Sequence, residues 1–332
     1  MHFCSLPIFG LLSLLLPLTK ALAPTHLVYE FPNGTWIENL AVRSCGSVLL
    51  TIITSPDLYL INPLSHSPKP VHLHHFDSAL WLVGITETTP DTFHLVAANG
   101  TFATPAPAPG SNRIYTVAFP PNSDTPRISL AATLPEAQLL NGLTTLDSTT
   151  ILAADSQKGV VWAINIITSR SRIVLNDPLM APGPLLPTLG INGLKLRGST
   201  LYFTNSAQAL LAKIEINPDG TAAGKAIVVA RSPTGANFDD FALDWRGDAF
   251  LATGPGNSIE EVGSDGEPQV IIAGIVNSTE IAEPTSAQFG RTAADREVLY
   301  VTTGGGLAAP VDGDEIVGGQ LVAVDTDGLW RV

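Results

Sequence analysis

Short apolar runs, each opened by one or two small or polar residues, recur along the chain at roughly 50-residue intervals. Six segments share this form: Glu38-Asn39-Leu40-Ala41-Val42, Gly84-Ile85-Thr86-Glu87, Asn141-Gly142-Leu143-Thr144, Asn192-Gly193-Leu194-Lys195, Asp239-Asp240-Phe241-Ala242-Leu243 and Pro284-Thr285-Ser286-Ala287. After most of them a turn leads into another short apolar strand, such as Leu201-Tyr202-Phe203-Thr204. Short strands repeated at such a period are typical of radial or stacked architectures. The pattern therefore predicts an all-β, six-bladed β-propeller.

An additional strand precedes the first repeat, at His26-Leu27-Val28-Tyr29-Glu30-Phe31. An open ring would leave an unpaired sheet edge, which favours aggregation. We therefore expect this N-terminal strand to pair into the last blade and close the propeller.

The first 23 residues have a different character. Leu11 to Leu18 form a short apolar core, and Ala21-Leu22-Ala23 is a small-residue cleavage site. These features predict a secretory signal peptide over residues 1–23, followed by one propeller domain over 24–332 and a location outside the cell or in the secretory-pathway lumen. The alternative, an uncleaved anchor, is disfavoured because the apolar stretch is shorter than the ~20 residues of a bilayer span. No later segment is apolar enough to span a membrane.

Charge and short motifs narrow the possible partners. The formal net charge of −13 repels phosphate backbones and anionic lipid, which argues against nucleic acid and membrane surfaces and favours small-molecule substrates. Three sequons predict N-glycosylation at Asn33, Asn99 and Asn277. Cys4 lies within the predicted leader, so Cys45 is left without an intramolecular partner and is expected to be a small buried strand residue.

A propeller brings the start of each innermost strand to one axial channel. The opening residues expected to converge there are Glu38, Glu87, Asn141, Asn192, Asp239 and Thr285. Carboxyls and amides gathered in one pocket form a candidate catalytic set, with Glu38, Asn141, Asn192 and Asp239 as its members. The alternative is that such residues only cap backbone groups around the channel, and we favour that alternative for Glu87 and Thr285.

At these residues the chain resembles the regucalcin and gluconolactonase family of six-bladed propellers. Asn192-Gly193-Leu194 and Phe238-Asp239-Asp240-Phe241 are similar to two motifs of that family. The resemblance implies that Glu38, Asn192 and Asp239 hold a divalent cation on the axis. Two departures weaken an inference of lactonase activity: Asn39-Leu40 stands where the family has Gly-Pro, and Asp240 stands where it has Gly.

A closer resemblance is to secreted fungal propellers of the same superfamily. It is carried by Ile37 to Arg43, Thr54 to Tyr59, Phe289 to Thr292 and Leu299 to Gly306. That group includes the hetero-Diels–Alderases of tropolone sesquiterpenoid biosynthesis, which join a tropolone quinone methide to a humulene-type olefin. The resemblance implies a natural-product enzyme with these substrate classes.

Such a cycloaddition requires no cofactor. A carboxyl with a raised pKa, Glu38 or Asp239, would move the proton that accompanies loss of water from the diene precursor. The amides of Asn141 and Asn192 would hydrogen-bond the tropolone oxygens. Residues expected to contact substrate are Leu40, Trp81, Glu87, Phe241, Thr285 and Phe289.

Two other functions stay open. A lactonase-like hydrolase would use Ca²⁺ or Mg²⁺ in the channel, bound by hard oxygen ligands and activating a water. A propeller that only binds small molecules would use the same pocket without turnover.

Overall fold

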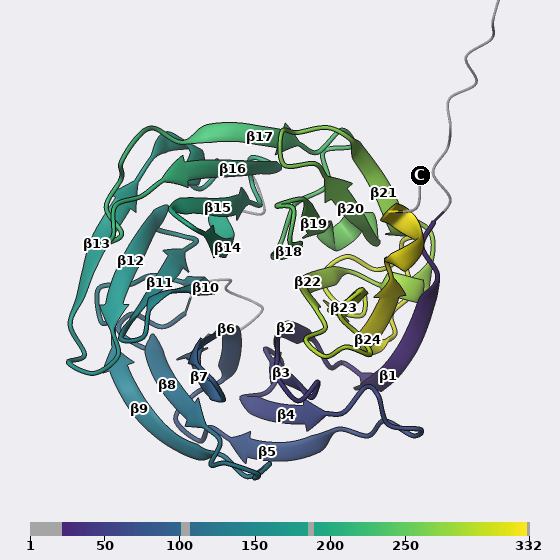
Figure 1. Ribbon diagram of the computed structural model, residues 1–332, viewed down its shortest axis with the longest axis horizontal. Helices are drawn as coiled ribbons and strands as arrows, with labels where there is room; N and C mark the ends of the chain where they lie inside the picture. The colour runs from purple at the N-terminus through teal and green to yellow at the C-terminus, as the bar shows by residue number, and fades with distance from the viewer. Residues whose placement is uncertain (1–21, 101–106, 185–188, 331–332) are drawn as a thin grey trace, which may run out of the picture.

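The computed structural model describes residues 22–100, 107–184 and 189–330. Its architecture is the predicted all-β, six-bladed propeller (Figure 1). Over this part of the chain, no helix combines the length and the apolar character that crossing a bilayer requires. The predicted signal peptide falls mainly on residues 1–21, which lie outside the described residues, so it stays a prediction.

Each blade is a four-stranded antiparallel sheet. Blade one contains β2 (Ile37–Val42), β3 (Val48–Ile52), β4 (Asp57–Ile61) and β5 (Val71–His75), and blade two contains β6 (Trp81–Thr89), β7 (Thr92–Ala98), β8 (Arg113–Ala118) and β9 (Arg127–Thr133). Blade three contains β10 (Leu140–Asp147), β11 (Thr150–Asp155), β12 (Val160–Asn165) and β13 (Ser171–Asn176), and blade four contains β14 (Ile191–Arg197), β15 (Thr200–Asn205), β16 (Leu210–Glu215) and β17 (Ile227–Arg231).

The last two blades complete the ring. Blade five contains β18 (Phe241–Leu243), β19 (Ala249–Ala252), β20 (Ser258–Val262) and β21 (Gln269–Gly274). Blade six contains β22 (Pro284–Phe289), β23 (Val298–Thr303), β24 (Gly318–Asp325) and the N-terminal strand β1 (Thr25–Asn33), which pairs antiparallel with β24. Short 3₁₀ turns cover Pro178–Met180, Gly254–Gly256, Thr279–Ile281 and Asp327–Trp330. The two ends of the described chain therefore share one sheet.

The first strand of each repeat lies nearest the axis, and strands such as β5, β9 and β17 form the rim (Figure 1). Apolar side chains fill the space between neighbouring blades, in one buried cluster for each of the six interfaces. The cluster between blades six and one takes Val28 and Phe31 from β1 and Leu50 from β3. Each blade thus buries its apolar faces only when both neighbours are present.

The innermost strands carry a local irregularity where they approach the axis. The pairing register with the next strand shifts in β2, β6, β10, β14 and β22, which is the signature of a β-bulge. A bulge places an additional residue on one strand and redirects its side chains. In β2 the shift falls between Ile37 and Asn39, so Glu38 and Asn39 both turn toward the channel.

One expectation about the fold is wrong. Cys45 is exposed in the turn between β2 and β3, not buried in a strand. Its turn includes Gly46 with a φ of 92°, a conformation that only the backbone of glycine adopts easily. The polar and small residues of this segment had marked a turn that the strand prediction overlooked.

Candidate functional site

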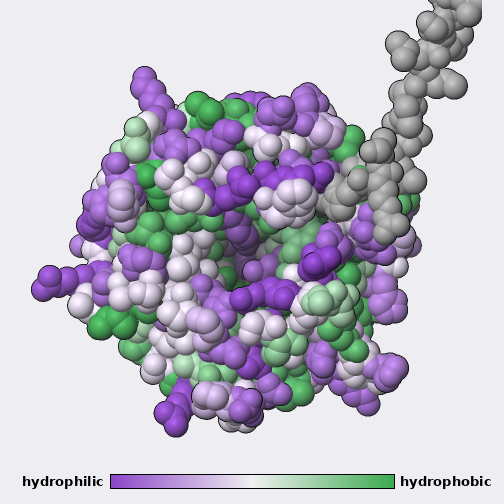
Figure 2. All heavy atoms as spheres, viewed as in Figure 1, coloured by the Kyte–Doolittle hydropathy of each residue, from purple (hydrophilic) through white to green (hydrophobic). Residues whose placement is uncertain are grey.

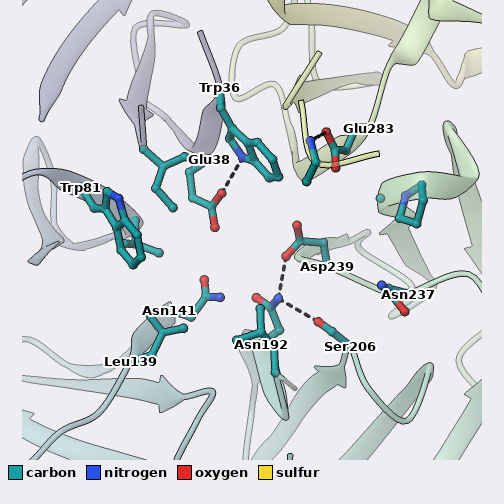
Figure 3. A pocket seen from close by; sticks show the side chains of 16 residues that line it. Trp36, Glu38, Trp81, Leu139, Asn141, Asn192, Ser206, Asn237, Asp239 and Glu283 are labelled. Atoms are coloured by element: carbon teal, nitrogen blue, oxygen red, sulfur yellow. Dashed lines mark hydrogen bonds between the residues drawn. The ribbon is translucent and has the colours of Figure 1, made fainter. Parts of the chain in front are cut away.

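A cavity of about 320 Å³ occupies one end of the axial channel (Figure 3). Figure 2 shows that the surface is hollowed at the centre of the ring. All six blades contribute to its lining, and among the described residues no lysine or arginine lines it. The four candidate catalytic residues Glu38, Asn141, Asn192 and Asp239 all lie in this cavity, as does Trp81.

The lining residues form two rings because side chains two apart on a strand point to the same side. The deeper ring contains Glu38, Val83, Asn141, Asn192 and Asp239. The ring nearer the mouth contains Trp36, Trp81, Leu139 and Asn237, each two positions earlier, together with Glu283, which lies two positions before Thr285. Sequence reasoning found the deep ring in four blades but overlooked Trp36, Leu139, Asn237 and Glu283. Counting back two residues from each predicted position would have found them.

Glu38 and Asp239 are held by neutral donors rather than by basic side chains. The indole Nε1 of Trp36 donates to Oε2 of Glu38 at 2.7 Å, and Nδ2 of Asn192 donates to Oδ1 of Asp239 at 2.7 Å. The same Nδ2 donates to Oγ of Ser206 at 2.9 Å. Both carboxyls point toward the centre of the cavity (Figure 3).

Burial without a cationic partner changes the protonation of these acids. Desolvation raises the pKa of Glu38 from 4.5 to about 7, with further increases from the charges of Asp240 and Glu283, against the opposing hydrogen bond from Trp36. Desolvation also raises the pKa of Asp239 well above its usual value, and the nearby charge of Glu38 adds to the effect. Near neutral pH the cavity can therefore both donate and accept protons.

Glu283 is a third acid in the cavity, and its backbone is tightly fixed. Its φ is 56°, a left-handed conformation that is uncommon for a non-glycine residue. Its N–H donates to Oδ1 of Asn257 at 2.9 Å, and Oε2 accepts the N–H of Ala308 at 3.1 Å. Burial raises the pKa of Glu283 to about 7, against several opposing bonds from the backbone near Ala308. Strained, fixed acids of this kind cluster at functional sites.

Buried polar side chains close the floor of the cavity. Asn39 donates to Oδ2 of Asp240 at 3.0 Å, and Ser286 lies 3.2 Å from each of these two residues. Lys195 approaches from the far end of the channel and donates to Oδ1 of Asp240 at 2.7 Å. Asn39 and Asp240 are the two departures from the family motif noted above, and here they form the floor.

Glycine completes the floor on the other three blades. A Cβ on Gly84 would lie 2.1 Å from the carbonyl oxygen of Asn141, and one on Gly142 would lie 2.4 Å from that of Asn192. A Cβ on Gly193 would lie 2.8 Å from Cα of Asp240. Neighbouring innermost strands therefore approach backbone to backbone, leaving no room for a side chain.

Two residues that were expected in the pocket, Glu87 and Thr285, do not line the cavity. Glu87 lines a separate depression at the far end of the channel and pairs with Arg291, because the deep-ring position of blade two belongs to Val83, four residues earlier. Thr285 has the expected position in β22, but it is buried and its hydroxyl donates to the carbonyl of Ile37 at 2.7 Å. It ties blade six to blade one and does not line the cavity.

Three apolar residues expected at the substrate also lie outside the cavity. Leu40 and Phe241 follow the point where the innermost strands turn toward the axis and pack between blades. Phe289 lies near the opposite end of β22, edge-to-face on Phe250 with ring centroids 5.1 Å apart. Of the apolar residues expected at the substrate, Trp81 lines the cavity, where Val83 and Leu139 complete the apolar wall.

The sequon at Asn99 adjoins the cavity wall, because a Cβ on Gly100 would lie 2.3 Å from the ring of Trp81. Asn33 and Asn277 are exposed, whereas Asn99 is half-buried. The hydroxyl-bearing Thr101 of the second sequon lies outside the described residues.

The cavity offers oxygen donors suited to a hard cation. No group of three or more His, Cys, Asp or Glu residues in the described ranges is arranged to hold a metal. Glu38, Asp239 and the amide oxygen of Asn192 are the ligands available for Ca²⁺ or Mg²⁺. Asn192 Oδ1 is buried and has no hydrogen-bond partner among the described residues, so it remains available as a ligand or acceptor.

The described residues define a six-bladed propeller with a cavity at one end of its axial channel. Regucalcin from Agrobacterium tumefaciens superposes with a TM-score of 0.63 over 91% of this chain and 95% of its own, at 15% identity. A luciferin-regenerating enzyme gives a TM-score of 0.67 at 13% identity, covering 92% of this chain and 96% of its own. At these identities the likeness shows the fold alone.

Sequence comparison identifies two fungal relatives that share a functional name. A protein of Phoma sp named "Putative hetero-Diels-Alderase" is 29% identical over 310 residues, covering 84% of this chain and 86% of its own length. "Putative hetero-Diels-Alderase asR5" of Sarocladium schorii is 27% identical, covering 92% of this chain and 84% of its own. No protein-family model matches the chain. The resemblance to hetero-Diels–Alderases noted from the sequence is confirmed, and homology to proteins with this name supports an enzymatic role.

Proposed function

We propose that this protein catalyses an intermolecular hetero-Diels–Alder reaction between a tropolone quinone methide and a humulene-type sesquiterpene olefin. The observation that carries the proposal is the cavity, which combines two buried carboxyls, Glu38 and Glu283, and the half-buried carboxyl of Asp239 with an apolar wall above a closed floor. The names of the relatives support this reaction class. The substrates themselves are part of the proposal.

The first step makes the reactive diene. The leaving hydroxyl of a hydroxymethyl tropolone takes a proton from a neutral carboxyl as its C–O bond breaks. A second, ionised carboxyl takes the proton of the ring hydroxyl, so one water leaves and the quinone methide forms. Glu38 and Asp239 perform these two roles, because burial and mutual repulsion favour one proton shared by the pair.

The second step is the cycloaddition, which needs no proton. The carbonyl oxygen and the methylene carbon of the quinone methide each form one bond to the olefin, and no atom leaves. Hydrogen bonds from the cavity to the tropolone oxygens lower the energy of the accepting orbital, with the amide of Asn141 as one donor. Holding both partners in a near-attack geometry supplies ~7–11 kcal/mol of the barrier.

The proposal is tested by mixing a quinone-methide precursor with humulene and measuring adduct formation with and without protein. We expect faster and more stereoselective formation than in buffer. Asp239→Asn and Glu38→Gln should each lower the rate about 100-fold, because they remove a group that transfers a proton. Glu136→Gln, at an exposed carboxyl away from the cavity, is the control for loss of a charge. Adduct formation at the buffer rate would contradict the proposal.

A second candidate is a metal-dependent lactonase-like hydrolase, favoured by the unpartnered Oδ1 of Asn192 in a cavity that also contains the carboxyls of Glu38 and Asp239. A bound Ca²⁺ or Mg²⁺ would polarise a lactone carbonyl. Glu38, Asn192 and Asp239 would hold it. Stoichiometric metal in purified protein, together with lactone hydrolysis that is lost on chelation, would favour this candidate. Adduct formation that survives chelation would favour the cycloaddition.

The proposed setting is the secretory pathway, through the leader over residues 1–23 and glycans at Asn33, Asn99 and Asn277. Mass spectrometry of the mature protein would test both, by reading the first residue and the mass of each sequon peptide. A mature chain that still carries residues 1–23 would contradict the leader prediction.

A further inference from the structure

We infer that the cavity holds its two reactants on two neighbouring walls, with a hydroxyl-bearing ring against Asn192 in blade four and a hydrocarbon against Val83 and Leu139 in blades two and three. This inference rests on the proposed function and extends it to the orientation of the reactants. It assigns specificity to Val83, Leu139 and Asn192, residues of three consecutive blades.

The hydrocarbon wall is continuous. Trp81 and Val83 come from β6, Leu139 immediately precedes β10, and Ile53 follows β3. Trp81 and Leu139 lie together on one side of the cavity, away from Glu283 and Asn237 (Figure 3). Val83 is the apolar member of the deep ring, where the adjacent blades carry Glu38 and Asn141. An olefin without polar groups gains most against such a surface, because no polar group there loses its hydration.

The polar wall has a specific chemical requirement. Both hydrogens of the Asn192 amide nitrogen face acceptors, Oγ of Ser206 at 2.9 Å and Oδ1 of Asp239 at 2.7 Å. Its Oδ1 is buried and has no partner among the described residues. A buried acceptor without a partner costs free energy, so a ligand that donates an O–H to this oxygen is favoured. The ring hydroxyl of a tropolone supplies that donor, whereas a hydrocarbon does not.

The shape of the cavity makes this division decisive for stereochemistry. Because the floor is closed by Asn39, Asp240 and the glycines, both reactants use the same mouth. Each then rests against a wall of different chemistry, so one face of the olefin meets the diene. Fixing that approach supplies the orientation that a bimolecular reaction lacks in solution.

A reciprocal pair of isosteric variants tests the inference by binding, without turnover. Leu139→Asn places an amide on the apolar wall, and Asn192→Leu removes the acceptor from the polar wall. Tropolone and α-humulene are titrated separately into wild-type and variant protein, with quenching of the cavity tryptophans Trp36 and Trp81 as the signal. We expect Leu139→Asn to weaken α-humulene about tenfold and tropolone less than about twofold. Asn192→Leu should show the opposite pattern.

Two milder variants support the interpretation if either of the first two fails to fold. Val83→Thr keeps the shape but adds a hydroxyl to the apolar wall, and should weaken α-humulene selectively. Asn192→Ala should weaken tropolone selectively. Circular dichroism and the melting temperature of each variant establish that it is folded.

The outcomes separate this inference from the proposed function. Equal losses for both probes, the reversed pattern, or no binding of either probe to the wild type would overturn the inference. Selective losses together with no adduct formation would support the two-wall cavity and overturn the proposed reaction. Adduct formation together with equal losses of both probes in the variants would support the proposed reaction and overturn the two-wall cavity.

Discussion

At the scale of single residues, the site is a set of acids without basic partners. Glu38, Asp239 and Glu283 share one cavity, and among its described lining residues none is cationic. The sequence indicated Glu38 and Asp239, because each opens an innermost strand. It did not indicate Glu283, which precedes a proline and reaches the cavity through a left-handed backbone conformation. Only the folded chain shows that it joins the other two acids.

The raised pKa values predict a pH dependence of stability. Glu38 and Glu283 have a pKa of about 7 in the folded protein and about 4.5 when unfolded. Between these values the folded state retains protons that the unfolded state has lost, so the free energy of unfolding falls as pH rises through this range. Chemical denaturation at pH 5, 6, 7 and 8 measures the slope.

Glu283→Gln tests the origin of that slope. Its neutral amide removes one of the two titrations, so we expect the variant to lose less stability than wild type between about pH 5 and 7. Glu136→Gln removes an exposed carboxyl and serves as the control. A wild-type stability that increases steadily across this range would contradict the raised pKa values.

At the scale of single elements, the innermost strands decide what reaches the channel. The register shift in each of β2, β6, β10, β14 and β22 directs side chains to the axis that simple alternation would place elsewhere. The shift in β2 is why Leu40 lies between blades although the sequence suggested a channel position, whereas Phe241 lies between blades on β18, which pairs without a shift. Glycine at the floor allows the strands to meet, as the close approach of Gly142 to Asn192 shows.

Gly142→Ala is expected to damage both stability and activity. The added Cβ would lie 2.4 Å from the carbonyl oxygen of Asn192 and 2.8 Å from Cα of Gly193, so β14 must shift. Overpacking of this kind costs about 1–3 kcal/mol of folding free energy. Moving Asn192 also disturbs its contact with Asp239, and adduct formation should fall at least about tenfold.

Gly224→Ala is the matched control, because nothing lies within 4 Å of its Cβ position. Its free energy of unfolding should stay within about 0.5 kcal/mol of wild type. A Gly142→Ala protein as stable and as active as this control would show that the floor tolerates a side chain.

At the scale of the whole molecule, stability depends on a ring in which each blade supports the next. Strand β1 completes blade six beside β24, and its Val28 and Phe31 belong to the cluster shared with blade one. Phe31 packs edge-to-face on Tyr29 and Tyr59, with ring centroids 5.1 and 5.2 Å apart. The N-terminal strand therefore contributes to the interface on which the cavity's geometry depends.

Phe31→Ala should lower the free energy of unfolding by about 3 kcal/mol, because it removes a buried ring at this interface. Leu27→Ala, on the same strand with a side chain that is 48% exposed, should cost much less. Urea denaturation of both variants provides the comparison. Equal and small effects would indicate that β1 adds little to the packing between blades six and one.

The sequence by itself determined the repeat, the strand content and four of the polar residues in the cavity. These features depend on local patterns, since a few neighbouring residues are enough to show the apolar alternation of a strand and the residues of a turn. Which residues share the cavity was decided by the tertiary structure. Register shifts, close glycine contacts and the depth of each strand set whether Val83 or Glu87 faces the axis, and such offsets depend on neighbouring blades. The two walls of the cavity arise in the same way, because Leu139 and Asn192 come to line one cavity only when the ring is assembled.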